Sequence, residues 1–288
     1  MSIQGSGTSS SSAQAARKAF AIRLRDVRRS AGLSQRELSR RAGWHESKTS
    51  RIESAIAEPS ESDVTKWCQV CSAEHLVSEL VAELRAAAMM WLDWRRAERQ
   101  GLKQLNVAVR EVYERTKIFR SYCASMIPGL LQTPEYTTAV LDSLRRRRQV
   151  PVDDVAEAVE ERMARQRILY EGEHRFAFVL ESAALRYQVG GPAVLEAQLR
   201  HLLRVMSVPS VSISIIPFAI DRTDRWAVES FYVHDEFQAH VELVSAFLTI
   251  TNPREISMYL ETFATLARMA VTGRAARELI NHALSELE

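Results

Sequence analysis

Residues 32–53 read GLSQRELSRRAGWHESKTSRIE, and this stretch decides how the N-terminal part of the chain folds. Ser34 opens a capping-box pattern, because its hydroxyl can accept the amide of Glu37 while the Glu37 carboxylate reaches back to Ser34. A short helix is therefore expected to start there and to end at Gly43, which tolerates the positive φ of a tight turn. A further helix is predicted over residues 45–54.

The flanking sequence adds one helix on each side. Residues 18–30 mix apolar residues and arginines at helical spacing, and residues 62–71 form another periodic segment after Pro59. Two short helices joined by a turn of three or four residues that contains glycine are typical of a helix-turn-helix. The sequence therefore predicts an all-α helix-turn-helix domain.

Positive charge is concentrated in the same part of the chain. Residues 1–51 contain eleven Lys or Arg against three Asp or Glu, a net charge of +8, so the rest must carry −6 of the total of +2. A basic N-terminal segment on an acidic body indicates a polyanionic partner. We expect this partner to be double-stranded DNA.

The domain closely resembles the lambda-repressor-like, Cro-type (xenobiotic response element) helix-turn-helix family over residues 18–73. The matching positions are Gly32-Leu33-Ser34-Gln35, Glu37-Leu38, Ala42-Gly43 and Ser50-Arg51-Ile52-Glu53. In this family the third helix enters the major groove and the second lies across the DNA backbone. The resemblance implies base contacts for Glu46, Ser47 and Arg51, phosphate contacts for Ser34, Gln35 and Lys48, and a structural ion pair between Arg28 and Glu53.

Two positions depart from the family pattern. His45 stands where Ser or Thr usually caps the third helix, and Trp44 stands where a small aliphatic residue is common. Because imidazole is a poor N-cap, the start of this helix is predicted to within about one residue. A shift by one residue would exchange the roles of Ser47 and Lys48.

The remaining sequence predicts an α+β part. The segments with helical periodicity are residues 76–100, 105–125, 190–206 and 253–269. The segments with the alternation of short strands are residues 176–180, 211–215, 226–233 and 241–247. The expected fold class is mainly α, with a small antiparallel or mixed sheet covered by helices in the C-terminal part. The expected divisions are a disordered tail (1–14), the DNA-binding domain (15–73), connecting and dimerisation helices (74–125) and an effector or partner-binding domain (126–288).

Residues 128–136 read PGLLQTPEY, and here the chain resembles WhiJ-type actinobacterial regulators, in which a Cro-type head precedes a body with this string. The resemblance covers nearly the whole chain, and its further matches include Arg162, Arg165, Gln166 and Glu181. The first three share a helical face, where they could bind an anionic ligand or a partner, or pair with Glu181. A structural ion pair is the favoured interpretation.

Several classes of protein do not fit the composition. The longest unbroken apolar stretch, residues 86–92, is far shorter than the roughly 20 residues of a membrane-spanning helix. The N-terminus does not resemble a secretory signal, so the expected location is the cytoplasm, on the nucleoid. Cys68 and Cys71 are expected to pack in a helix, because no further ligands complete a zinc site. We expect neither a metal nor a cofactor.

An enzyme is not expected either. The sequence has no P-loop, dinucleotide-binding, nucleophile-elbow or zinc-protease motif. His234, Asp235, Glu236 and His240 form the densest ionisable cluster among the predicted strands, and we expect them in an exposed hairpin turn.

We therefore predict a sequence-specific DNA-binding transcriptional regulator. It is expected to act as a homodimer on a palindromic operator, because one short helix reads only a few base pairs. The C-terminal domain is expected to sense a small-molecule effector or a small partner protein. The alternative is a protein-protein interaction module whose helix-turn-helix head is not operator-specific.

Overall fold

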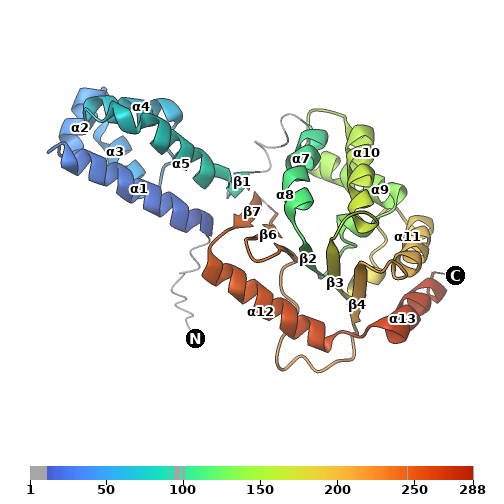
Figure 1. Ribbon diagram of the computed structural model, residues 1–288. Helices are drawn as coiled ribbons and strands as arrows, with labels where there is room; N and C mark the ends of the chain where they lie inside the picture. Colours follow the sequence, from blue (N-terminus) through green and yellow to red (C-terminus); the bar gives the residue numbers. More distant parts are fainter. Residues whose placement is uncertain (1–11, 90, 94–97, 99–100, 245, 288) are drawn as a thin grey trace, which may run out of the picture. The chain divides into compact units, whose positions relative to one another are not determined.

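The computed structural model describes residues 12–89, 91–93, 98, 101–244 and 246–287 (Figure 1). The chain divides into two units, Met1–Leu92 with Leu248–Ile250, and Asp93–Phe247 with Thr251–Glu288. The boundary passes through strands β1 (Trp91–Asp93) and β7 (Ala246–Ile250). The first unit ends at Leu92, well beyond residue 73, where the sequence suggested that the helix-turn-helix domain ends. The expected tail falls mostly outside the described residues, and its last three residues belong to the first helix.

The first unit is all α. Its elements are α1 (Ser12–Ser30), α2 (Gln35–Ala42), α3 (Glu46–Glu53), α4 (Glu61–Val70), η1 (Glu74–Leu76) and α5 (Val77–Met89). Leu24, Leu38, Ile52 and Trp67 form the centre of its core, and each is at most 1% exposed. The Trp67 indole also donates a hydrogen bond to the Leu24 carbonyl, at 3.1 Å. Burial of these large apolar side chains fixes the short α2 and α3, which are too short to be stable alone.

Helix α5 completes this core. Leu80 and Leu84 pack into the same cluster, and Arg23 of α1 forms ion pairs with Glu79 and Glu83. The helix predicted over residues 76–100 is therefore wrong in two respects. It ends at Met89, before β1, and it belongs to the core of the N-terminal unit rather than to a connector.

The second unit contains a mixed sheet with helices on both faces. Its longer helices are α7 (Leu102–Ala108), α8 (Arg110–Arg115), α9 (Pro134–Arg148), α10 (Val155–Arg165), α11 (Pro192–Val205), α12 (Pro253–Met269) and α13 (Gly273–Ser285). The short 3-10 helices are η3 (Gly129–Leu131), η4 (Gln166–Leu169) and η5 (Ser182–Leu185). The remaining strands are β2 (Ile118–Cys123), β3 (Arg175–Glu181), β4 (Val211–Ile216), β5 (Phe231–His234) and β6 (Gln238–Glu242).

The strands follow one another in the order β7-β6-β5-β2-β3-β4. Strand β2 is parallel to β3, which is parallel to β4, whereas β5 is antiparallel to both β2 and β6. The predicted fold class, a helical head and an α+β body with a small mixed sheet, is confirmed.

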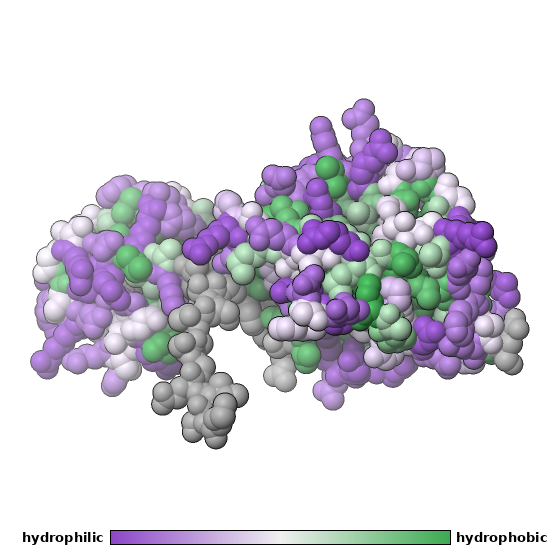
Figure 2. Space-filling model, turned by 90° about the horizontal axis from the view of Figure 1, so that it is seen from below, coloured by the Kyte–Doolittle hydropathy of each residue, from purple (hydrophilic) through white to green (hydrophobic). Residues whose placement is uncertain are grey.

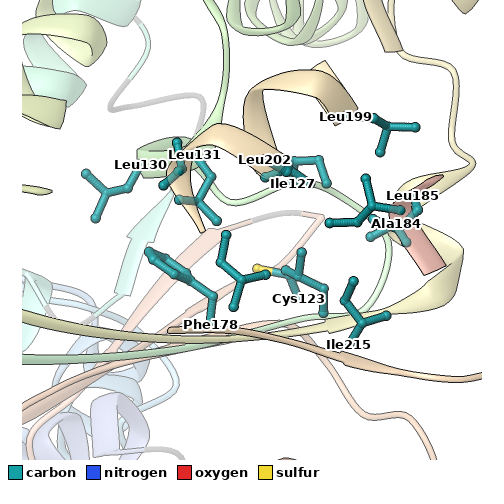
Figure 3. Packing of buried hydrophobic residues seen from close by; sticks show 14 of the residues in the cluster. Cys123, Ile127, Leu130, Leu131, Phe178, Ala184, Leu185, Leu199, Leu202 and Ile215 are labelled. Carbon is teal, nitrogen blue, oxygen red and sulfur yellow. The ribbon is translucent and has the colours of Figure 1, made fainter. Parts of the chain in front are cut away.

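The main core of this unit lies between one face of the sheet and the helices α9, α11 and α13. Figure 3 shows side chains of the strands, such as Cys123, Phe178 and Ile215, facing Leu199 and Leu202 of α11. Helix α12 packs on the other face, where the rings of Tyr259 and Phe231 have centroids 5.0 Å apart. Both faces of the strands are therefore buried.

Strand β2 corrects the helix predicted over residues 105–125. Helical structure ends at Arg115, and Thr116 turns to an extended backbone with ψ of 125°. β2 has hydrogen-bonded neighbours on both sides, and this pairing outweighs the helical spacing of the apolar residues that include Phe119. Two strand predictions were also too long. Of residues 226–233 only 231–233 belong to β5. Residues 241–242 end β6 and residues 246–247 begin β7, so the single predicted strand spans parts of two strands.

Candidate nucleic-acid interface

Helix α2 starts and ends where its local sequence places it. The Ser34 hydroxyl accepts a hydrogen bond from the Glu37 amide at 3.1 Å, and Gly43 adopts a left-handed conformation with φ of 73°. The Glu37 carboxylate, which was expected to bind the Ser34 amide, binds two arginines instead. Arg40 and Arg41 bind the Glu37 carboxylate at 2.7 and 2.8 Å and lower its pKa to about 2.

Helix α3 starts at Glu46, which settles the one-residue ambiguity of the sequence. His45 is the N-cap, and its Nδ1 accepts from the Ser47 amide at 3.3 Å and lies 2.8 Å from the Ser47 hydroxyl. Trp44 packs against Trp67 with ring centroids 6.1 Å apart. The two departures from the family pattern thus have local roles, one as a cap and one as a core contact.

A buried ion pair fixes the end of α3. Arg28 donates to the Glu53 carboxylate from Nε at 2.5 Å and from Nη2 at 2.9 Å, and Gln35 donates to it at 2.7 Å. Glu53 is 2% exposed and Arg28 7%. Burial acts to raise the pKa of Glu53, but the hydrogen bonds and charges around it outweigh burial, so the net shift is downward. The pair that the resemblance implied is present, and it positions α3 against α1.

The buried and exposed residues of α3 divide it into two faces. Thr49, Ile52 and Glu53 are buried, and the Thr49 hydroxyl lies 2.6 Å from that of Ser39 in α2. The side chains exposed on the opposite face are those of Glu46, Ser47, Ser50 and Arg51. Three of these were predicted to contact bases, and the helical period brings Ser50 to the same face, one turn after Glu46. Ser50 was not among the predicted base-contacting residues, although its spacing from Glu46 could have identified it.

An open groove lies between α3 and the start of α2. Its lining residues are Arg28, Ser34, Gln35, Arg36, Glu46, Ser47 and Ser50. Arg36 was not predicted as a site residue either. Its side chain is 84% exposed, and its Nε lies 2.9 Å from the Glu46 carboxylate. Figure 2 shows that hydrophilic residues cover most of the visible face of this unit.

The predicted phosphate ligands are not equally free. Ser34 caps α2 and the Gln35 amide is bound to Glu53, so both lie beside the groove but already have partners. The Lys48 ammonium lies 2.6 Å from Asp63 and 4.5 Å from the centre of the Trp44 ring. In the part of the chain that the structure describes, the Arg51 side chain has neither an ion pair nor a hydrogen bond.

The candidate residues of the C-terminal body do not form one site. Gln166 donates to the carbonyls of Gly129 and Gln132, and Arg162 and Arg165 both contact Asn106. The favoured ion pair with Glu181 is therefore wrong. Glu181 instead binds Arg222 at 2.5 and 2.9 Å and accepts from the Tyr122 hydroxyl at 2.8 Å.

The histidines predicted in an exposed turn are buried. Asp235 does form the turn between β5 and β6, with φ of 48°, but His234 and His240 are only 2% and 5% exposed. Their rings lie 4.9 Å apart. Burial lowers the pKa of His234 to about 4, and burial together with His234 lowers that of His240 to about 3. The prediction failed because Phe119, Tyr113 and Phe247 cover the two rings.

Cys68 and Cys71 are buried in the first core, and no group of three or more His, Cys, Asp or Glu among the described residues could hold a metal ion. No helix in the described ranges is both long and apolar enough to span a membrane.

Two family models match the chain. One is described as a helix-turn-helix domain and matches residues 19–84, which confirms the helix-turn-helix prediction. The other is a domain of unknown function, DUF5753, and matches residues 108–282. Neither a curated protein nor a solved structure matches significantly. Since the second model covers more than half of the sequence, the chain belongs to the DUF5753 family, with a helix-turn-helix domain before the family domain.

Proposed function

We propose that the chain is a sequence-specific DNA-binding transcriptional regulator without enzymatic activity. The observation that carries the proposal is the exposed face of α3, where Glu46, Ser47, Ser50 and Arg51 project from a helix whose other face is buried. A rigid helix that presents polar side chains of this length is what the major groove of DNA accepts.

Base recognition follows from the chemistry of two side chains. The Arg51 guanidinium has no bound partner among the described residues, and it can donate two parallel hydrogen bonds to guanine O6 and N7. Glu46 can accept from the N4 amino group of cytosine. Each such contact discriminates against a wrong base by about 1–3 kcal/mol.

The proposal includes a homodimer on a palindromic operator. One eight-residue helix contacts few base pairs, and two copies across adjacent grooves multiply the discrimination. The same proposal includes a relationship to WhiJ-type regulators and a cytoplasmic location on the nucleoid. It also includes a C-terminal domain that senses an effector or a partner protein.

The test is selection of a preferred duplex from a random library, followed by affinity measurements with Arg51→Ala. This variant should lose about 1–3 kcal/mol of preference for the selected duplex over a random one. Lys66→Ala removes the same charge from an exposed position on α4 and should keep the preference. Equal preference in the parent and in Arg51→Ala would show that α3 does not read bases.

A second candidate function is supported by the ion pairs beside α3. Arg36, Lys48, Arg40 and Arg41 are each paired with an acid, so much of the positive charge near this face is neutralised. A head of this kind suits an interaction module that is not operator-specific. That function predicts no enriched sequence in the selection and the same salt-dependent affinity for every duplex.

A further inference from the structure

Two arginines at the end of α10 converge on one neutral side chain. The Arg162 Nε donates to the Asn106 Oδ1 at 2.9 Å, and the Arg165 Nη2 lies 3.4 Å from the same oxygen. Arg165 also donates from Nη1 to the Asn106 carbonyl at 3.1 Å. Asn106 is 8% exposed, and its Nδ2 donates to the Leu102 carbonyl at 2.8 Å, which holds the amide in place. The two guanidinium groups are therefore close neighbours at a fixed position.

Neither positive charge is neutralised by an acid of the described chain. Within the described ranges, Arg162 and Arg165 have no ion pair, and Glu161 on the same helix pairs with Arg110 at 2.6 Å. Glu242 acts on Arg162 from beyond ion-pair distance and is itself 3.4 Å from Arg148. Partly buried charges of the same sign normally require a counter-charge, because their repulsion is weakly screened there.

The surroundings leave one donor atom of Arg165 without an acceptor. The guanidinium of Arg165 lies over the Tyr113 ring, 4.9 Å from its centre, and its Nε is buried without an acceptor. Burial, and next the charge of Arg165, lower the pKa of Arg162 to about 10, so the group is still charged at neutral pH. A buried donor without an acceptor is costly, and an oxyanion supplies acceptors and the missing negative charge together.

We propose that Arg162 and Arg165 form a binding site for the carboxylate or phosphate group of a small effector molecule. Each guanidinium offers planar, paired donors that match two oxygens of such a group. Both side chains keep part of their surface in solvent, so the anion can reach them without unfolding of α10.

The test is thermal unfolding of the full chain in sodium phosphate, sodium acetate and sodium chloride at equal ionic strength. Phosphate or acetate should raise the unfolding midpoint of the parent in a saturable manner, since a ligand that binds the folded state stabilises it. Saturation by phosphate alone identifies a phosphate group in the effector, and saturation by acetate identifies a carboxylate. An unsaturable response equal to that of chloride overturns the proposal.

Variants separate binding from a structural role. Arg165→Gln should weaken the saturating anion by about tenfold or more, because one of the two forks is lost. Arg167→Gln removes an exposed arginine of the neighbouring η4 and should bind like the parent. If Arg165→Gln is unfolded, Arg165→Lys keeps the charge without the fork and should also bind more weakly. A variant of Arg165 that folds and binds the anion like the parent contradicts the proposal. No DNA is present, so this failure is distinct from failure of the proposed function.

Discussion

The position of α3 depends most on the carboxylate of Glu53. It receives hydrogen bonds from Arg28 and Gln35, and the backbone carbonyl of Glu53 accepts one from Arg25 at 2.8 Å. Helices α1 and α2 are thereby joined to the last turn of α3. The family resemblance predicts the pair of Arg28 and Glu53. It does not predict the contact of Gln35 with Glu53, because a glutamine at a helix start is equally compatible with solvent or phosphate.

Removal of this charge should be costly. Glu53→Gln leaves Arg28 buried without its counter-ion, and we expect the free energy of unfolding of the first unit to fall by about 3 kcal/mol. Urea unfolding followed by circular dichroism measures it. Glu58→Gln is the control, since its pair with Arg17, at 3.5 Å, is about 39% exposed and should contribute less than about 1 kcal/mol. Similar small effects in both variants would mean that the Glu53 pair does not fix the domain.

Two buried histidines should make the second unit sensitive to mild acid. Their folded-state pKa values, about 4 and about 3, lie below the ordinary 6.5, so the unfolded chain binds protons first as the pH falls. Stability should therefore decrease from pH 6.5 downward, by about 1.4 kcal/mol per pH unit for each histidine. Glu53 adds to the loss only at lower pH, because its depressed pKa contributes stability that is lost below about 4.5.

A substitution isolates this effect. His234→Phe keeps a ring among Phe119 and Tyr113 and removes a buried Nδ1 that has no hydrogen-bond partner. Between pH 6.5 and 4.5, the fall in unfolding free energy should be smaller than that of the parent by about 1.4 kcal/mol per pH unit. His282→Gln, at an exposed position on α13, should follow the parent curve. An unchanged slope in His234→Phe would rule out this histidine as a source of acid sensitivity.

At the scale of elements, caps and turns were predictable and strand pairing was not. Ser34 and Gly43 mark the ends of α2 through local chemistry alone, and the structure places both as expected. β2 was missed because its residues, Ile118–Cys123, become a strand only by pairing with β3 and β5, which lie far along the chain. The buried histidines were missed for the same reason, since distant aromatic residues cover them.

The turn between α2 and α3 allows a sharp test. A Cβ at Gly43 would meet no atom within 4 Å, so the cost of a substitution arises from its φ of 73° alone. Gly43→Ala should lower the unfolding free energy of the first unit by about 1 kcal/mol. Gly43→Asn should cost less, because asparagine tolerates the left-handed region. Chemical denaturation of the two variants and the parent decides this, and equal costs would contradict a conformational origin.

At the scale of the whole molecule, the fold class and the kind of head were predictable, but the limit of the first unit was not. The spacing of apolar residues over residues 76–100 predicts an amphipathic helix. It does not indicate which of the two cores the apolar face of this helix joins. Leu80 and Leu84 join the core of Trp67 and Leu24. The first compact unit therefore extends to Leu92, beyond residue 73, where the sequence placed the end of the head.

Fragments test the corrected limit. A fragment of residues 12–73 loses Leu80, Leu84 and the acids that pair with Arg23, so it should be less stable than residues 12–92 by about 4 kcal/mol. Thermal melts of both fragments by circular dichroism provide the comparison. Equal melting temperatures would place α5 outside the cooperative unit.

Because Lys48 lies between Trp44 and Asp63, the fluorescence of Trp44 can report whether Lys48 keeps these contacts. The ammonium group stands 4.5 Å from the indole ring and 2.6 Å from the carboxylate. A lysine that moves to a DNA phosphate must leave both, and the emission of Trp44 should change as the cation withdraws. Fluorescence titration of the unlabelled chain can therefore follow this exchange of partners, and Asp63→Asn should shift it toward the nucleic acid.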